Sequence, residues 1–188
     1  RDSPYENGKD SKYEMDWITR YEHGEFFSKD SIKLDENLRY STGLGRPVYG
    51  GGGIMPDFFV PIDTTQYSDY HRNLVAKGVV IKTTMKFIED HRKELQNKYK
   101  KFETFNNKFE ISDEVLANMQ TLADKEKIKF DEKQYQQSLP LIKTQLKALI
   151  ARDLWDMNEY FQIMNTTNNS VIQALKVLNE GMYEKMVK

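Results

Sequence analysis

The sequence predicts a mainly α-helical protein in which a short β-ribbon precedes a helical bundle. From residue 63 onward, apolar side chains recur every three or four positions, as they do on one face of a helix. Before that point, four consecutive glycines at residues 50–53 separate two short apolar segments, a pattern typical of a sharp turn between strands. The change in composition near Ile62 therefore predicts two parts, residues 1–62 and residues 63–188.

Composition excludes several functional classes. The 188 residues carry a net charge of −1, which gives no overall attraction to nucleic acid or to a membrane surface. The chain has no cysteine, which excludes disulfides, a thiol nucleophile and thiolate metal sites. No apolar run approaches the roughly 20 residues that a membrane-spanning helix needs. Because the chain begins with Arg1 rather than Met, we expect a fragment or a processed product.

The first part is expected to hold few regular elements. A helix is predicted at residues 12–20, anchored by Trp17 and Ile18, and a further short element within residues 28–40. The glycine turn is expected to join a strand at Val48 to a second strand at residues 58–60, which Pro61 closes. A lone two-stranded ribbon is only marginally stable in water, so we expect this one to belong to a larger sheet.

The second part begins with two predicted helices, at residues 66–77 and 80–101. Thr64 or Thr65 is expected to cap the first helix, and Gly78 to end it. The second helix shows an apolar stripe with helical spacing: Ile81, Met85, Ile88, Leu95, Tyr99 and Phe102. Residues 102–111 are compatible with either helix or extended chain. Ser112 then predicts the cap of another helix, with acidic residues in its first turn.

Residues 131–155 predict one long helix or two. Pro140 removes a backbone donor near the middle, so we expect a kink or a restart around Ser138. The helical spacing of apolar residues continues over residues 156–164, and residues 165–169 are expected to form a turn. Ser170 is expected to cap one last helix, whose apolar face consists of Val171, Leu175, Leu178, Met182 and Met186.

The sequence assigns no catalytic, cofactor-binding or metal-binding residue. A phosphate loop requires a helix after its glycines, whereas Ile54-Met55-Pro56-Asp57 follows here. The three histidines, His23, His71 and His91, lack the spacing of metal ligands on a helix, and we interpret them as surface or structural residues. No serine lies in a recognisable nucleophile motif.

Two further groups of residues have a simple structural interpretation. Asp153, Asp156 and Glu159 form a carboxylate cluster that solvent exposure or helix capping would explain. An aromatic series could stack on sugars or bases, but without a basic patch it is better explained by core packing. Its members are Tyr67, Tyr70, Phe87, Tyr99, Phe102, Phe105 and Phe109.

The glycine-rich segment at residues 45–57, Gly-Arg-Pro-Val-Tyr-Gly-Gly-Gly-Gly-Ile-Met-Pro-Asp, resembles the Gly-Gly-Ile-x-Pro-Asp segment of carboxy-terminal processing proteases, also called tail-specific proteases. In those enzymes the segment supplies a closing strand of the protease domain. Residues 4–8 and 13–16 resemble the insertion of bacterial members, and residues 146–155 resemble their helical tail. The resemblance therefore extends over nearly the whole chain.

The catalytic motifs of that family do not occur in this chain. The family uses a serine with a lysine base, the lysine lying in a Phe-Gly-Lys-Gly-like stretch, and a PDZ domain with a glycine-rich carboxylate-binding loop. None of these motifs is present. The resemblance thus implies the C-terminal part of such an enzyme, beginning just beyond the catalytic lysine. Residues 1–62 would be a remnant of the protease core with an insertion, and residues 63–188 an α-helical accessory domain.

The resemblance implies a non-catalytic C-terminal region of a bacterial serine endopeptidase, located in the periplasm or cell envelope. Its partners would be the catalytic and PDZ domains, the peptide substrate of the intact enzyme, and a second copy in the case of self-association; the chain alone is expected to be inactive. The alternative is a helical interaction or dimerisation module of an unrelated protein. A sugar- or nucleotide-binding domain is a third class, based only on the glycines and aromatic residues.

Overall fold

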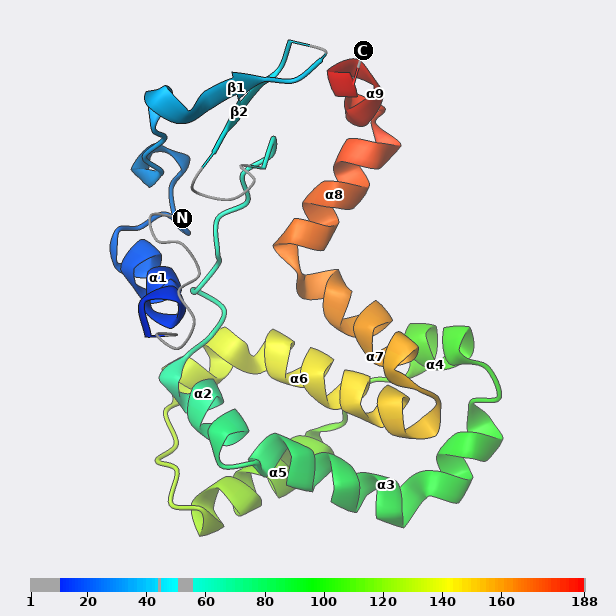
Figure 1. Cartoon of the computed structure of the whole chain (residues 1–188). Helices are drawn as coiled ribbons and strands as arrows, with labels where there is room; N and C mark the ends of the chain where they lie inside the picture. Colours follow the sequence, from blue (N-terminus) through cyan, green and yellow to red (C-terminus); the bar gives the residue numbers. More distant parts are fainter. Residues whose placement is uncertain (1–10, 44, 51–55, 188) are drawn as a thin grey trace. The chain divides into compact units, whose positions relative to one another are not determined.

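The computed structural model describes residues 11–43, 45–50 and 56–187, and they are mainly helical, with a short two-stranded ribbon (Figure 1). This confirms the predicted fold class. The chain divides into two compact units, which are described separately. The helical unit comprises Thr64–Ile172. The ribbon unit comprises Arg1–Asp63 together with Gln173–Lys188. The sequence pattern instead places the residues at the end of the chain with the helical bundle.

The ribbon unit begins with helix α1 (Ser11–Glu22), which confirms the helix predicted at residues 12–20. Of its two expected anchors, Trp17 is wrong, because it is 60% exposed, whereas Ile18 is half-buried. Two short 3-10 turns follow, η1 (Lys29–Ser31) and η2 (Glu36–Leu38), and lead into strand β1 (Arg39–Ser41).

The ribbon pairs β1 with β2 (Pro47–Tyr49) in antiparallel register, with Tyr40 opposite Val48. The Thr42 N–H donates to Arg46 O (2.9 Å) and the Gly50 N–H to Leu38 O (2.9 Å). Hydrogen-bonded pairs alternate along such a ladder, so Pro47 falls at a non-hydrogen-bonded position. Its missing N–H therefore costs the ribbon no bond.

The second strand expected at residues 58–60 is wrong, because this segment is irregular. Strand β2 instead pairs with the upstream segment β1, which a loop of only a few residues brings close. That loop is closed locally: the backbone N–H of Arg46 donates to the Thr42 hydroxyl oxygen (3.1 Å). The expected turn at Gly51, Gly52 and Gly53, with Ile54 and Met55, lies outside the described residues.

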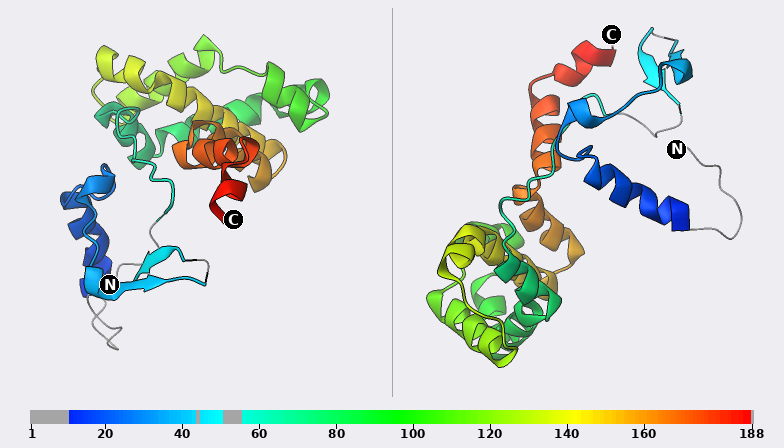
Figure 2. Two further views of the ribbon diagram at one scale, coloured as in Figure 1. Left: turned by 90° about the horizontal axis from the view of Figure 1, so that it is seen from above. Right: turned by 90° about the vertical axis from the view of Figure 1, so that its left-hand side faces the viewer.

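The helical unit contains α2 (Asp69–Ala76), α3 (Val79–Lys98), α4 (Phe102–Lys108), α5 (Asp113–Lys125), α6 (Glu132–Leu154) and α7 (Met157–Met164), followed by η3 (Asn165–Thr167). Helix α6 is central to this unit, since it contacts α2, α3 and α7, while α3 also contacts α2 and α5. Figure 2 shows the packed helices from two further directions.

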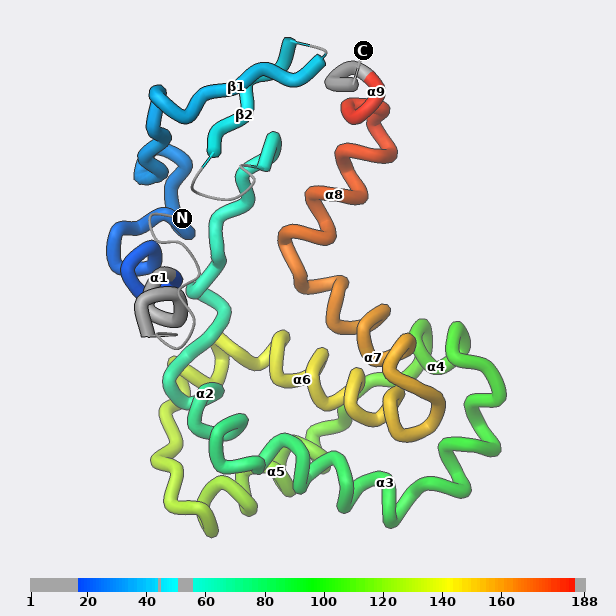
Figure 3. Tube along the Cα trace, in the orientation of Figure 1, coloured from blue at the N-terminus to red at the C-terminus, as the bar shows by residue number. Residues whose placement is uncertain are grey.

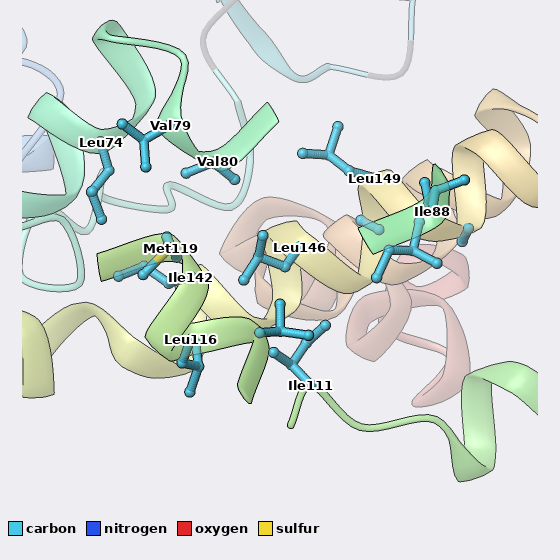
Figure 4. Close-up of a cluster of buried hydrophobic side chains, with 14 of the residues drawn as sticks. Leu74, Val79, Val80, Ile88, Ile111, Leu116, Met119, Ile142, Leu146 and Leu149 are labelled. Atoms are coloured by element: carbon cyan, nitrogen blue, oxygen red, sulfur yellow. The ribbon is translucent and has the colours of Figure 1, made fainter. Parts of the chain in front are cut away.

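One hydrophobic core holds the helical unit together, with members from Tyr70 in α2 to Ile163 in α7 (Figure 4). Ile142 and Leu146 of α6 are completely buried, as are Leu74 of α2 and Phe105 of α4. Aliphatic side chains of this size each contribute roughly 1.5–3 kcal/mol when fully removed from water. This core explains why the segment is compact without any sheet.

The apolar stripe predicted for α3 is partly wrong. Ile88 and Leu95 are buried as expected, but Ile81 and Met85 are 47% and 65% exposed. The buried face instead includes Thr83 and Thr84, which a hydrophobicity pattern does not select. Both threonines satisfy their hydroxyls within the helix, donating to Val79 O and Val80 O (2.9 Å each), and so tolerate burial.

Helix α2 starts later than expected. Its cap is Ser68, whose hydroxyl oxygen accepts the His71 N–H (3.2 Å), rather than Thr64 or Thr65. Gly78 ends this helix as predicted: it has φ +70°, and α3 begins at the next residue. A left-handed residue of this kind suits glycine, and it lets the chain turn sharply between α2 and α3 (Figure 3).

Helix α5 begins as predicted, with Ser112 as its cap. Helix α6 runs unbroken through Pro140, which confirms the alternative of one long helix over residues 131–155, whereas the restart considered near Ser138 is wrong. Pro140 is exposed, where water can satisfy the carbonyl that its missing N–H leaves unpaired. At the end of the chain, Asn168 rather than Ser170 caps α8, because the Asn168 side chain accepts the Ser170 N–H (3.0 Å).

The last helix is also two helices rather than one. Helix α8 (Asn169–Asn179) is followed by α9 (Met182–Val187), and Gly181 between them has φ +63°. The single apolar face expected across this segment is therefore interrupted.

Candidate functional site

The most distinctive chemical feature of the helical unit is a buried polar cluster formed by Ser68, His71, Ser138 and Gln145. Ser68 and His71 lie at the start of α2, and the other two residues lie on α6. Ser68, His71 and Ser138 are all less than 5% exposed. Such groups must find hydrogen-bond partners inside the protein, so their arrangement shows what the cluster does.

The two serines connect the start of α2 to the middle of α6. The Ser138 hydroxyl lies 2.8 Å from the Ser68 hydroxyl and donates to Gln66 O at 2.8 Å. It also accepts the backbone N–H of Ser68 at 2.9 Å. Each hydroxyl is therefore hydrogen-bonded to at least one backbone group and to the hydroxyl of the other serine.

The cluster lacks the geometry of a serine nucleophile with a histidine base. Activation would need a ring nitrogen of His71 within hydrogen-bond reach of a serine hydroxyl. The described contact is instead between the His71 backbone N–H and Ser68 Oγ, while His71 Nε2 pairs with Gln145 Oε1 at 3.0 Å. These bonds cap a helix and join two helices, which is a structural role.

Burial keeps the His71 ring neutral. Removal from water lowers the pKa of His71 below its ordinary value of 6.5, and the hydrogen bond to Gln145 opposes that effect only in part. Nδ1 is buried without a hydrogen-bond partner. The ring also stacks on Tyr67, with centroids 5.2 Å apart. Protonation would therefore place an uncompensated charge inside the unit.

The other sequence-predicted histidines and carboxylates also have structural roles or lie exposed. His91 Nδ1 lies 3.0 Å from Phe87 O, and His23 is exposed. Asp153 pairs with Arg92 (2.6 Å), and Asp156 caps α7 by accepting the Met157 N–H (2.6 Å). In the described ranges, no group of three or more histidine or carboxylate side chains could hold a metal ion.

The aromatic series is mainly core, as predicted. Tyr70, Tyr99, Phe105 and Phe109 are buried, and Phe87 and Phe102 pack against the core. The exception is Tyr67, whose side chain is 45% exposed although its ring covers His71. Burial also raises the pKa of Tyr70 to about 12. No ring of the series needs a sugar or base to explain its position.

In the ribbon unit, the two ends of the glycine-rich segment are joined. Arg46, which precedes β2, forms an ion pair with Asp57, which follows the glycines. Gly50 also has a local reason to be glycine, since a Cβ at this position would lie 3.3 Å from the Tyr40 ring. Tyr49 donates its hydroxyl to Glu36 (3.1 Å). These contacts give the described residues of this segment structural roles in the ribbon unit.

Helices of the described chain are too short or too polar to cross a lipid bilayer. Comparison with known proteins matches residues 70–156 to a family of unknown function (DUF8443). These residues run from the start of α2 to the turn between α6 and α7, and so contain most of the helical core. No curated protein matches the chain, and no solved structure matches it.

Proposed function

We propose that this chain is the non-catalytic C-terminal region of a serine endopeptidase of the carboxy-terminal processing type. The observation that carries the proposal is the segment at residues 45–57, whose sequence resembles the closing-strand motif of that family. Pro47–Tyr49 of this segment form strand β2, and Arg46, just before β2, forms an ion pair with Asp57 at the end of the segment. A short strand of this kind, followed by a helical unit, is what the resemblance implies.

The ribbon itself supports a place in a larger sheet. Two strands of three residues each are too few for independent stability, and Tyr40 and Val48 on them are 60% and 46% exposed. Additional strands from a protease core would supply the missing pairing. The intact enzyme would cleave unfolded proteins near their C-termini, with the serine and lysine lying outside this chain.

The helical unit would then be an accessory domain of the protease. Its buried polar cluster has no nucleophile–base contact, in keeping with a part that supports catalysis without performing it. In this role it would pack against the catalytic and PDZ domains or help to order the substrate path. The periplasm or cell envelope is the location that goes with this proposal.

A peptidase assay tests the proposal. The 188-residue chain and the complete product of its gene are incubated separately with an unfolded protein that has a free C-terminus. We expect cleavage by the complete product only. Cleavage by the chain alone that is lost in Ser138→Ala or Ser68→Ala would contradict the proposal, because it would place a working nucleophile in the helical unit.

A second candidate is a helical interaction or dimerisation module. The observation in its favour is the exposure of three apolar residues at helical spacing on α8, Ile172, Leu175 and Leu178, at 47%, 54% and 61%. Light scattering on the chain and on Leu175→Glu/Leu178→Glu distinguishes the cases. A dimer that the double variant dissociates would favour self-association, whereas a monomer in both would count against it.

A further inference from the structure

Three neighbouring side chains of α6 hold the backbone of the segment that leads into α2. Ser138 contacts Gln66 O and the Ser68 N–H, at 2.8 and 2.9 Å. Gln134 Oε1 accepts the Tyr70 N–H at 2.7 Å. Gln137 Nε2 donates to Thr65 O. Four hydrogen bonds thus tie residues 65–70 to one stretch of a helix more than 60 positions away.

These contacts differ from ordinary packing because each one pairs a side chain of α6 with a main-chain group of the segment. Among the segment's own side chains, the Ser68 hydroxyl also takes part, at 2.8 Å from the Ser138 hydroxyl, but the other contacts do not depend on the identity of the segment's side chains. Main-chain groups next to a helix start are the ones that lack partners within the helix, and Ser68 and Tyr70 lie at that position. Binding these groups fixes the path of the backbone rather than a particular side chain.

We infer that Gln134, Gln137 and Ser138 act as a clamp, which holds residues 65–70 on α6 and fixes the direction in which the chain enters the helical unit. The clamp lies where the first unit of the chain gives way to the second, since the helical unit begins at Thr64. It makes the residues before α2 part of the helical unit, although they contain no helix. This inference does not depend on the proposed protease function.

The clamp explains why α6 carries a run of uncharged polar residues, which helix propensity alone does not explain. Within α6, the stretch Gln134-Tyr135-Gln136-Gln137-Ser138 is rich in uncharged polar residues. Gln134, Gln137 and Ser138 contact the segment, whereas Gln136 donates to Glu132 on the same helix (2.7 Å). Gln136 is thus a matched control: it is the same residue type, on the same helix, and outside the clamp.

Hydrogen exchange on the full chain tests the contacts one by one. In Ser138→Ala we expect the Ser68 amide to exchange about tenfold faster, and in Gln134→Ala we expect the same of the Tyr70 amide. Each variant removes one hydrogen bond to that amide, and the loss of one such bond raises the exchange rate by about tenfold. Gln136→Ala should change neither amide. If Ser138→Ala fails to fold, the half-buried Gln134 still provides the test. Unchanged exchange at Tyr70 in Gln134→Ala would overturn the inference.

A distance measurement tests the consequence for the chain path. Because the chain has no cysteine, spin labels can be placed at two engineered cysteines, Thr64→Cys and Lys93→Cys, both exposed. We expect a narrow distance distribution, which broadens in Gln137→Ala/Ser138→Ala and stays narrow in Gln136→Ala. Distributions of equal width in all three proteins would show that the clamp does not position the segment.

Discussion

At the scale of single residues, the most consequential group is the neutral, buried His71. Its side chain is 1% exposed, and its Nδ1 has no hydrogen-bond partner. The unfolded chain exposes the same ring to water, where it binds a proton with a pKa near 6.5. Folding therefore depends on pH through this residue.

The direction of the effect follows from the lowered pKa of folded His71. Between that lowered pKa and 6.5, the unfolded state binds more protons, so the free energy of unfolding rises with pH. The contribution of His71 is fully present above pH 6.5 and is lost as pH falls below that value. We predict that urea denaturation midpoints fall between pH 7.5 and pH 5.5 in the natural chain.

His71→Gln isolates the contribution of His71 to the pH dependence of unfolding, since the glutamine amide can still donate to Gln145 but does not titrate. We expect the fall in midpoint between the two pH values to be smaller in His71→Gln than in the natural chain. An equal fall in both proteins would show that other groups cause the pH dependence.

At the scale of elements, α3 shows how the buried face of a helix differs from its apparent apolar stripe. We predict that Ile88→Ala lowers the free energy of unfolding by about 2–5 kcal/mol, because it leaves a cavity beside the core. Met85→Ala, one turn earlier and 65% exposed, should change it by less than about 0.5 kcal/mol. Chemical denaturation measures both. Comparable losses would mean that Met85 is covered, against the assigned orientation of α3.

The sequence predicts well those helix ends that depend on a few neighbouring residues. Ser112 followed by acidic residues marks the start of α5, and Gly78 marks the end of α2, because capping and left-handed turns involve only near neighbours. Strand β1 has no comparable signal. The glycines instead predict a partner for β2 at residues 58–60, whereas a short upstream loop pairs β2 with β1.

The polar cluster could not be predicted for a different reason. Ser68 and Ser138 are 70 positions apart, and each alone resembles any surface serine. Only the packing of α2 against α6 brings them together and buries them. The sequence also does not single out Ser68 as the cap of α2, because Thr64 and Thr65 carry the same local signal a few residues earlier.

At the scale of the whole molecule, the hydrophobic core that stabilises the fold lies in the helical unit. The hydrophobic core runs from Tyr70 to Ile163, all within the helical unit, and the clamp holds the residues just before this core, from Thr65 on, against α6. We predict that a fragment of residues 64–172 folds alone, with a cooperative thermal transition and a helical circular dichroism spectrum.

The matched fragment of residues 1–63 should show no cooperative transition, because its ribbon has two strands of three residues and lies outside the core. If the fragment of residues 64–172 were instead unfolded, or the fragment of residues 1–63 folded cooperatively, the predicted difference in stability between these two parts of the chain would be wrong.

The central proposal is that this chain is the non-catalytic part of a protease whose bond-cleaving groups lie outside these 188 residues. Mass spectrometry tests it most directly, on the protein captured from its source cells with an antibody raised against residues 64–172. We predict a polypeptide longer than 188 residues, with peptides from an upstream domain that carries a serine and a lysine in the family's motifs. Upstream peptides from an unrelated domain, or a mature polypeptide that never contained one, would contradict the claim.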